Sequence, residues 1–272
     1  MGGASFGRAC AFALATVAVL ALYGCVGVVE PQSALPVRNA IVFDQLVIHS
    51  DFALPHKHRL LEDLRMQRGD VLARLNLPAS DEPIHVYLFE SEADFAKYLR
   101  EHHPDFPVRR AFFVESDTRL AVYAQWGDRV AEDLRHEVSH GYLHSVVRNI
   151  LLWLDEGLAE CFEVPRGDAG LNRPHVQLLL NKLLTQGWRP NLERLEHLST
   201  AGEMTQDDYA ESWAWAFWLL NTHPQKRDLL QQHLLALRRQ GNIEPLSQAL
   251  RRIEPQPEQA LVEHLYRLAP RP

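Results

Sequence analysis

The segment Leu134–His144 reads LRHEVSHGYLH and spaces three histidines four residues apart, at His136, His140 and His144. Residues four apart share one face of a helix, so two consecutive histidines could each direct a ring nitrogen at the same ion. Glu137 follows the first histidine, close enough to take a proton from a water activated by that ion. The pattern His-Glu-x-x-His therefore predicts a metal site with a general base beside it.

Helix geometry keeps the three histidines from sharing one ion. Residues eight apart are about 12 Å apart along a helix axis, whereas zinc–nitrogen bonds measure about 2 Å. We therefore expect His136 and His140 to be ligands, and His144 to be a structural histidine or to line the cleft. The metzincin pattern also fails, because its third histidine would stand where this chain has Val146.

A third ligand is found in WLDEGLAE, Trp153–Glu160, on the helix predicted next along the chain. If that helix folds back against the first, Glu156 completes a set of two histidines and one carboxylate. Such a set leaves a fourth position for water, as in catalytic zinc sites. Glu160 lies one turn further on the same face, where it could accept the remaining N–H of a ligand histidine and fix its tautomer.

HEVSH followed by WLDEGLAE resembles the gluzincin group of zinc metallopeptidases and, more narrowly, the peptidase-MA-like proteins. The resemblance is strongest over about residues 130–163. It implies a thermolysin-like zincin core that holds one Zn²⁺ ion. The ligands would be His136, His140 and Glu156, with Glu137 as the general base.

The resemblance also implies two features outside this segment. The strand Arg119–Gln125 would form the sheet edge against which an extended peptide lies, held by β-augmentation. Tyr209, in the predicted helix Asp207–Asn221, would stabilise the oxyanion that forms during hydrolysis. The alternative for Tyr209 is that it packs this helix into the core, as we expect of the neighbouring tryptophans such as Trp213.

The elements that must position these residues indicate an α+β fold, with an N-terminal mixed β-sheet followed by a mostly helical C-terminal half. Alternating, β-branched stretches predict strands at 39–52, 84–90, 109–115 and 119–125, the last two as a hairpin. Helical spacing of apolar residues predicts helices at 56–77, 91–102, 129–148, 152–163, 174–186, 205–221, 224–239, 244–252 and 256–268. The metal motif falls where strands give way to helices.

Composition limits the partners. The 272-residue chain is 46% apolar and 23% charged, enough to bury a large core. Its net charge of −7 argues against nucleic-acid binding, which requires clustered Lys and Arg. The peptide or protein substrate that we expect is what the resemblance to zinc metallopeptidases implies.

The N-terminus indicates export. Residues 1–24 resemble a lipoprotein-type signal peptide, in which Arg8 precedes an apolar run and LYGC ends at Cys25, the predicted lipidation site. An uncleaved membrane-anchoring helix is the alternative, because the apolar run extends to Val29. Residues 25–38 would then be a tether and 39–272 the peptidase-MA-like domain. Both interpretations predict a protein of the bacterial cell envelope that faces the periplasm.

The predicted function is zinc-dependent hydrolysis of peptide bonds, with Glu137 as the general base. The alternative is a non-catalytic, membrane-anchored binding or assembly protein with a structural or vestigial zinc site. An aminopeptidase is less favoured, because the Gly-x-Met-Glu-Asn element is absent, and no apolar span surrounds the motif as a membrane-embedded protease would require. The substrate, and endo- versus exopeptidase action, stay open.

Overall fold

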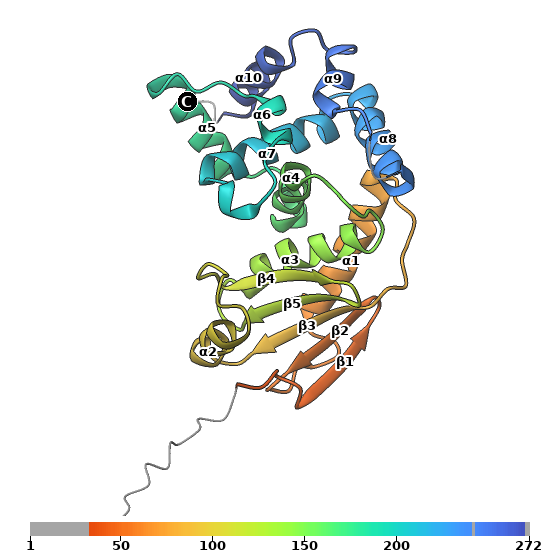
Figure 1. Ribbon diagram of the computed structural model, residues 1–272, viewed down its shortest axis with the longest axis vertical. Coiled ribbons are helices and arrows are strands. Elements are labelled where there is room, and N and C mark those ends of the chain that lie inside the picture. Colours follow the sequence, from red (N-terminus) through yellow and green to blue (C-terminus); the bar gives the residue numbers. More distant parts are fainter. Residues whose placement is uncertain (1–32, 241–242, 270–272) are drawn as a thin grey trace, which may run out of the picture. The chain divides into compact units, whose positions relative to one another are not determined.

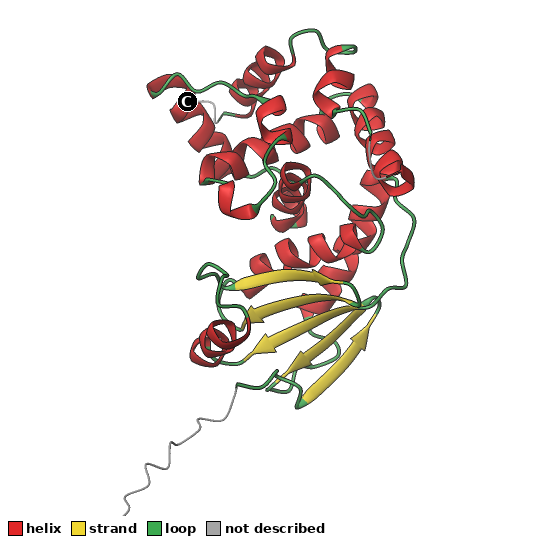
Figure 2. Ribbon diagram, viewed as in Figure 1, coloured by secondary structure: helices red, strands yellow, loops and turns green. Residues whose placement is uncertain are grey.

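Strands and helices separate along the chain as the sequence predicts (Figures 1 and 2). The computed structural model describes residues 33–240 and 243–269. Within these ranges, five strands form one mixed sheet before residue 126, and the half that follows is mostly helical. The α+β fold class is therefore confirmed. The predicted signal peptide, Cys25 and the first part of the tether lie outside the described residues.

The strands are β1 (Asn39–Phe43), β2 (Leu46–Ser50), β3 (Ile84–Phe89), β4 (Ala111–Ser116) and β5 (Arg119–Gln125). The helices are α1 (Arg59–Leu75), α2 (Glu92–His102), α3 (Val130–His144), α4 (Leu152–Glu163), α5 (Arg173–Thr185), α6 (Leu192–Glu196), α7 (Gln206–Asn221), α8 (Pro224–Gln240), α9 (Leu246–Arg251) and α10 (Pro257–Leu268). Two short 3₁₀ helices, η1 (Arg166–Asp168) and η2 (Ala201–Glu203), join them. The sequence did not predict α6, η1 or η2, which are too short to show a helical period.

The first predicted strand, 39–52, is two strands. β1 and β2 pair antiparallel as a hairpin, with Phe43 opposite Leu46. Asp44 turns the chain with a φ of 56°, a left-handed conformation that Asp tolerates better than most residues. The alternation of β-branched residues continues across this turn, so the sequence pattern predicted one strand instead of two.

The sheet order is β1-β2-β3-β5-β4. β2, β3 and β5 run parallel, and β4 pairs antiparallel with β5 as the predicted hairpin. The edge next to the helical half is thus β4, and the prediction that 119–125 forms the edge was wrong. β5 carries a buried run, Leu120–Ala124, as a strand paired on both sides does.

The two faces of the sheet bury different residues. Ile48, Val86 and Val122 align across β2, β3 and β5 and join the main core, with α1 and α3 on that side. Tyr87 and Tyr123 point to the opposite face and pack with α2. The site helix α3 is therefore fixed directly against the sheet.

Helix α4 packs closely between α3 and α7 (Figure 1). A Cβ atom on Gly157 would lie 2.4 Å from the backbone oxygen of Ser212, so only glycine allows this approach of α4 and α7. Trp213, Trp215 and Trp218 of α7 are buried, as expected for core tryptophans. No helix in the described ranges has the length and apolar character needed to cross a membrane.

Candidate metal centre

Helices α3 and α4 bring His136, His140 and Glu156 together. Nε2 of His136 lies 3.4 Å from Oε2 of Glu156, and Nε2 of His140 lies 3.7 Å from the same oxygen. Ligands of a tetrahedral ion with bonds of about 2.1 Å stand about 3.4 Å apart. The three atoms are thus spaced as ligands of one ion.

Glu156 supplies an independent sign of a cation. Its Oε2 atom is buried and has no hydrogen-bond partner among the described residues. A buried carboxylate oxygen without a partner is costly. A metal ion between the three groups would satisfy it, so these residues fit a bound metal ion.

The other nitrogen of each histidine faces a carboxylate. Nδ1 of His136 lies 3.0 Å from Oε2 of Glu163, and Nδ1 of His140 lies 3.0 Å from Oδ2 of Asp155. Glu163 accepts the Nδ1–H of His136, which leaves the Nε2 lone pair of His136 directed toward Glu156, whereas Asp155 lies beside Nδ1 of His140 without a well-aligned hydrogen bond. The fold therefore sets the tautomer of His136 that metal binding requires, and it places a carboxylate next to the corresponding nitrogen of His140.

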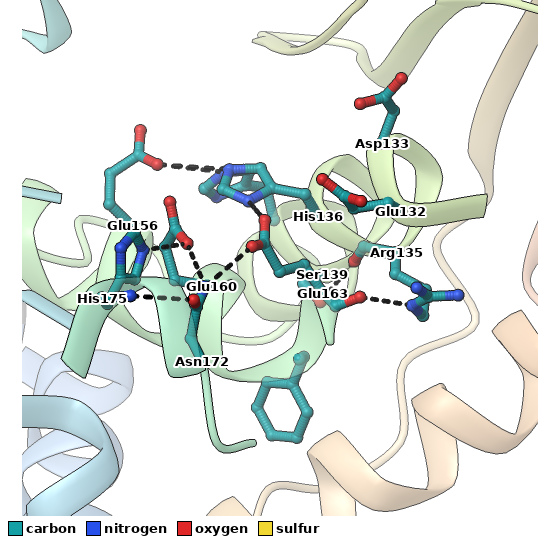
Figure 3. A network of polar contacts seen from close by, with 12 residues as sticks. Glu132, Asp133, Arg135, His136, Ser139, Glu156, Glu160, Glu163, Asn172 and His175 are labelled. Carbon is teal, nitrogen blue, oxygen red and sulfur yellow. Dashed lines mark hydrogen bonds and ion pairs between the residues drawn. The ribbon is translucent and has the colours of Figure 1, made fainter. Parts of the chain in front are cut away.

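The hydrogen bond predicted for Glu160 is made by Glu163 instead. Glu160 accepts from Nε2 of His175 at 2.7 Å and from Nδ2 of Asn172 at 3.3 Å (Figure 3). Asn172 also donates to Oε1 of Glu163 at 3.2 Å. The reason is tertiary, because α5 brings His175 to Glu160 and leaves the carboxylate one turn further along α4 to orient His136.

This carboxylate network changes the pKa values around His136. Burial alone would lower the pKa of His136, but the carboxylates of Glu156 and Glu163 beside its ring raise it well above the ordinary value. Burial and the neighbouring Glu160 raise the pKa of Glu163, against the effect of His136. The same carboxylates attract a proton or a metal ion, so we expect metal binding to weaken on acidification.

His144 is a structural histidine, one of the two roles expected for it. Nδ1 lies 2.6 Å from Oε2 of Glu115, and Nε2 lies 2.9 Å from Oδ2 of Asp155. With both ring nitrogens on carboxylates, the ring is held as a cation. It connects β4 to Asp155, the same residue that faces His140.

Two further groups also bring metal-ligating atoms together, namely His140, His144 and Asp155, and His136 with Glu160 and Glu163. In both, a carboxylate already faces the histidine nitrogen within 3.0 Å. Neither contains a carboxylate oxygen placed like that of Glu156, unpartnered and between two Nε2 atoms. The group of His136, His140 and Glu156 is therefore the better metal site.

Glu137 lies where two cavities meet. One, of about 510 Å³, extends along α2 toward Tyr209. The other, of about 400 Å³, extends toward η2. Both are also lined by His136, Arg109 and the segment 106–107. Burial raises the pKa of Glu137, against the effect of the two histidines, which suits a group that takes up a proton.

Tyr209 lies at the wall of the larger cavity and is only 6% exposed. Its hydroxyl oxygen accepts a hydrogen bond from Nη2 of Arg109 at 2.9 Å, so its own proton is free for another acceptor. Burial raises the pKa of Tyr209, and Arg109 opposes that shift. Helix α7 thus places Tyr209 at the site, and the side chain of Tyr209 is also buried as a core residue would be.

Sequence reasoning missed Asp155, Glu163 and Arg109. The first two had a detectable signal, because Asp155 precedes the ligand Glu156, and Glu163 lies seven residues after it on the same helix face. Arg109 had none, because it comes from the loop before β4. Neither the scan against protein-family models nor the search of curated proteins gave a match.

Proposed function

We propose that the protein is a zinc-dependent metallopeptidase of gluzincin type, as the sequence resemblance implies. The observation that carries the proposal is the unpartnered Oε2 of Glu156, which lies between the Nε2 atoms of His136 and His140 beside the cavity-lining Glu137. A bound zinc ion would polarise the scissile carbonyl and lower the pKa of a water molecule.

The remaining chemistry falls to side chains of the chain itself. Glu137 accepts the proton of the attacking water and delivers it to the leaving amine. Tyr209 donates its hydroxyl proton to the developing oxyanion, because Arg109 already occupies the acceptor side of that oxygen. Glu163 keeps His136 in the required tautomer, and the charge of Asp155 lies beside the corresponding nitrogen of His140.

The edge strand β4 supports binding of an extended peptide. Gln125 donates its N–H to the oxygen of Arg110 at 3.0 Å, which sets the alternation of hydrogen bonds along the pair. By that alternation, the residues that turn N–H and C=O groups to the free edge are Ala111, Phe113 and Glu115. The ring of Phe113 stacks on His140, with centroids 5.8 Å apart, so this edge runs beside the metal site.

The test combines metal analysis with peptide-library cleavage by the purified, zinc-loaded protein. We expect wild-type cleavage that a chelator abolishes and added zinc restores, and Glu137→Gln that binds zinc without turnover. Glu132→Gln is the matched control, since it changes an ion-paired carboxylate on the same helix. Hydrolysis by metal-loaded Glu137→Gln at the wild-type rate contradicts the role of Glu137, and a zinc-loaded wild type that cleaves nothing contradicts the peptidase.

We also propose that the protein acts in the bacterial cell envelope, anchored to the membrane and facing the periplasm. The proposal rests on the sequence pattern before Cys25. Replacement of Cys25 by serine should release the protein from the membrane fraction if the anchor is a lipid, whereas an uncleaved helix would retain it.

A further inference from the structure

Arg109 carries a positive charge without a carboxylate partner at the junction of the two cavities. Its Nη2 atom donates to Tyr209, and no ion pair is found for it among the described residues. Its neighbour Arg110, which lines the larger cavity, is different, because two of its nitrogens bind the carboxylate of Asp133 at 2.8 and 2.6 Å. Most donors of the Arg109 guanidinium are thus free for a ligand.

The acids that line the larger cavity are largely occupied. Asp133 pairs with Arg110, Glu132 with Arg129, Glu163 with His136, and Glu160 with His175 and Asn172. Of the rest, Glu137 is the proposed base and Glu92 lies in the first turn of α2, where the helix dipole favours it. Glu156 and Glu137 are the carboxylates whose charges act on Arg109, but neither forms an ion pair with it in the described part of the chain, so its free donors can still bind a ligand.

The course of β4 along α3 indicates which part of a peptide meets Arg109. Three contacts run in register, from Arg110 with Asp133, through Phe113 with His140, to Glu115 with His144. The metal ligands lie at the level of Phe113, and Arg109 lies beyond the start of the strand. A peptide paired antiparallel to β4 runs the opposite way, so its C-terminal part reaches Arg109.

We propose that Arg109 binds a carboxylate of the substrate on the C-terminal side of the scissile bond. The carboxylate is the free C-terminus or the side chain of an acidic residue, and a guanidinium can bind either one with two parallel hydrogen bonds. This inference deepens the proposed peptidase function and rests on it for the identity of the substrate as a peptide.

Peptide binding to zinc-loaded Glu137→Gln tests the proposal without turnover. Fluorescent peptides of one sequence are compared with a free or amidated C-terminus, and with Glu or Gln at each position of the C-terminal half. The carboxylate form should bind about tenfold to a hundredfold more tightly, as a charge-assisted hydrogen bond provides. The peptide pair whose two members differ in affinity shows whether Arg109 binds the C-terminus or a side chain.

Variants on the same background assign the effect to Arg109. Arg109→Gln should bring the affinity ratio of each peptide pair close to one, and Arg109→Glu should reverse it in favour of the neutral peptide. The ratio cancels any loss that comes from weaker support of Tyr209. Arg110→Gln, which removes an equal charge from the same cavity, should leave the ratio within about twofold, because its charge is already paired.

Equal affinity for carboxylate and neutral peptides overturns the proposal, as does a preference that survives Arg109→Gln. Neither result affects the peptidase function, which wild-type hydrolysis of the same peptides decides separately. Conversely, a carboxylate preference in binding without wild-type turnover would support Arg109 and contradict the peptidase.

Discussion

Replacement of Glu163 by glutamine should weaken zinc binding about tenfold. The Oε2 atom of Glu163 lies 3.0 Å from Nδ1 of His136, and its side chain is 18% exposed. A hydrogen bond to a charged group contributes about 1.5–3 kcal/mol. Glutamine keeps an acceptor but loses the charge, so about half of the upper value, roughly 1.4 kcal/mol or a factor of ten, should be lost. That agrees with the effect of similar residues around other metal sites.

Glu160 provides the matched comparison, because the sequence alone favoured it for the same role. Its hydrogen bonds go to His175 and Asn172, and the structure gives it none to a ligand histidine. Glu160→Gln should therefore weaken zinc binding no more than about threefold, through loss of a more distant charge. Competition with a chromophoric chelator measures both variants, with circular dichroism as the check that each remains folded.

Which of the two variants loses more zinc affinity decides which carboxylate orients His136. If Glu160→Gln weakens zinc binding more than Glu163→Gln does, the assignment of Glu163 as the residue that orients His136 is refuted. Equal and small effects would mean that neither carboxylate tunes the ligand.

Three further predictions concern stability and turnover. In urea unfolding, Gly157→Ala should destabilise the protein by about 2–3 kcal/mol, because the new Cβ meets the backbone of Ser212. The control Gly69→Ala should stabilise it by about 0.5–1 kcal/mol, because the new Cβ has no atom within 4 Å. Burial lowers the pKa of His144, but its two carboxylate partners raise it to about 9, so its charge stabilises the fold fully below about pH 6.5 and progressively less as the pH rises through 9. His144→Gln should accordingly cost about 3 kcal/mol at pH 6 and much less above pH 10, and a pH-independent loss in unfolding titrations would contradict this charge. Tyr209→Phe should keep zinc and lower kcat about a hundredfold with little change in KM, whereas an unchanged kcat would leave Tyr209 a packing residue.

The histidines of the candidate metal site could be predicted because their geometry is local. Four residues separate His136 from His140, and a helix places such residues on one face whatever surrounds it. Glu156 could also be predicted from the sequence, because only a short loop joins its helix to the helix of the histidines. The strand and helix pattern followed in the same way from the periodicity of apolar residues, except where elements such as α6 are too short to show one.

The edge strand and the partners of the ligands depend on segments distant in the chain. Both β4 and β5 have the composition of strands, and only the strand order of the sheet shows that β5 also pairs with β3, which leaves β4 at the edge. Similarly, both Glu160 and Glu163 lie on the same face of α4. Helix α5 brings His175 to Glu160, whereas α3 brings His136 to Glu163.

The sequence by itself thus determined the fold class and the helices that carry the site. It also determined that His136 and His140 share a helix face beside Glu137, because helical periodicity fixes these relations over a few residues, and that Glu156 follows on the next helix. Only the tertiary structure decided that β4 is the free edge, that Glu163 orients His136, and that Arg109 meets Tyr209 across 100 residues of chain. Those contacts follow from how α3, α4, α5 and α7 pack on one another and on the sheet. Such packing is a property of the whole core, and no single stretch of sequence encodes it.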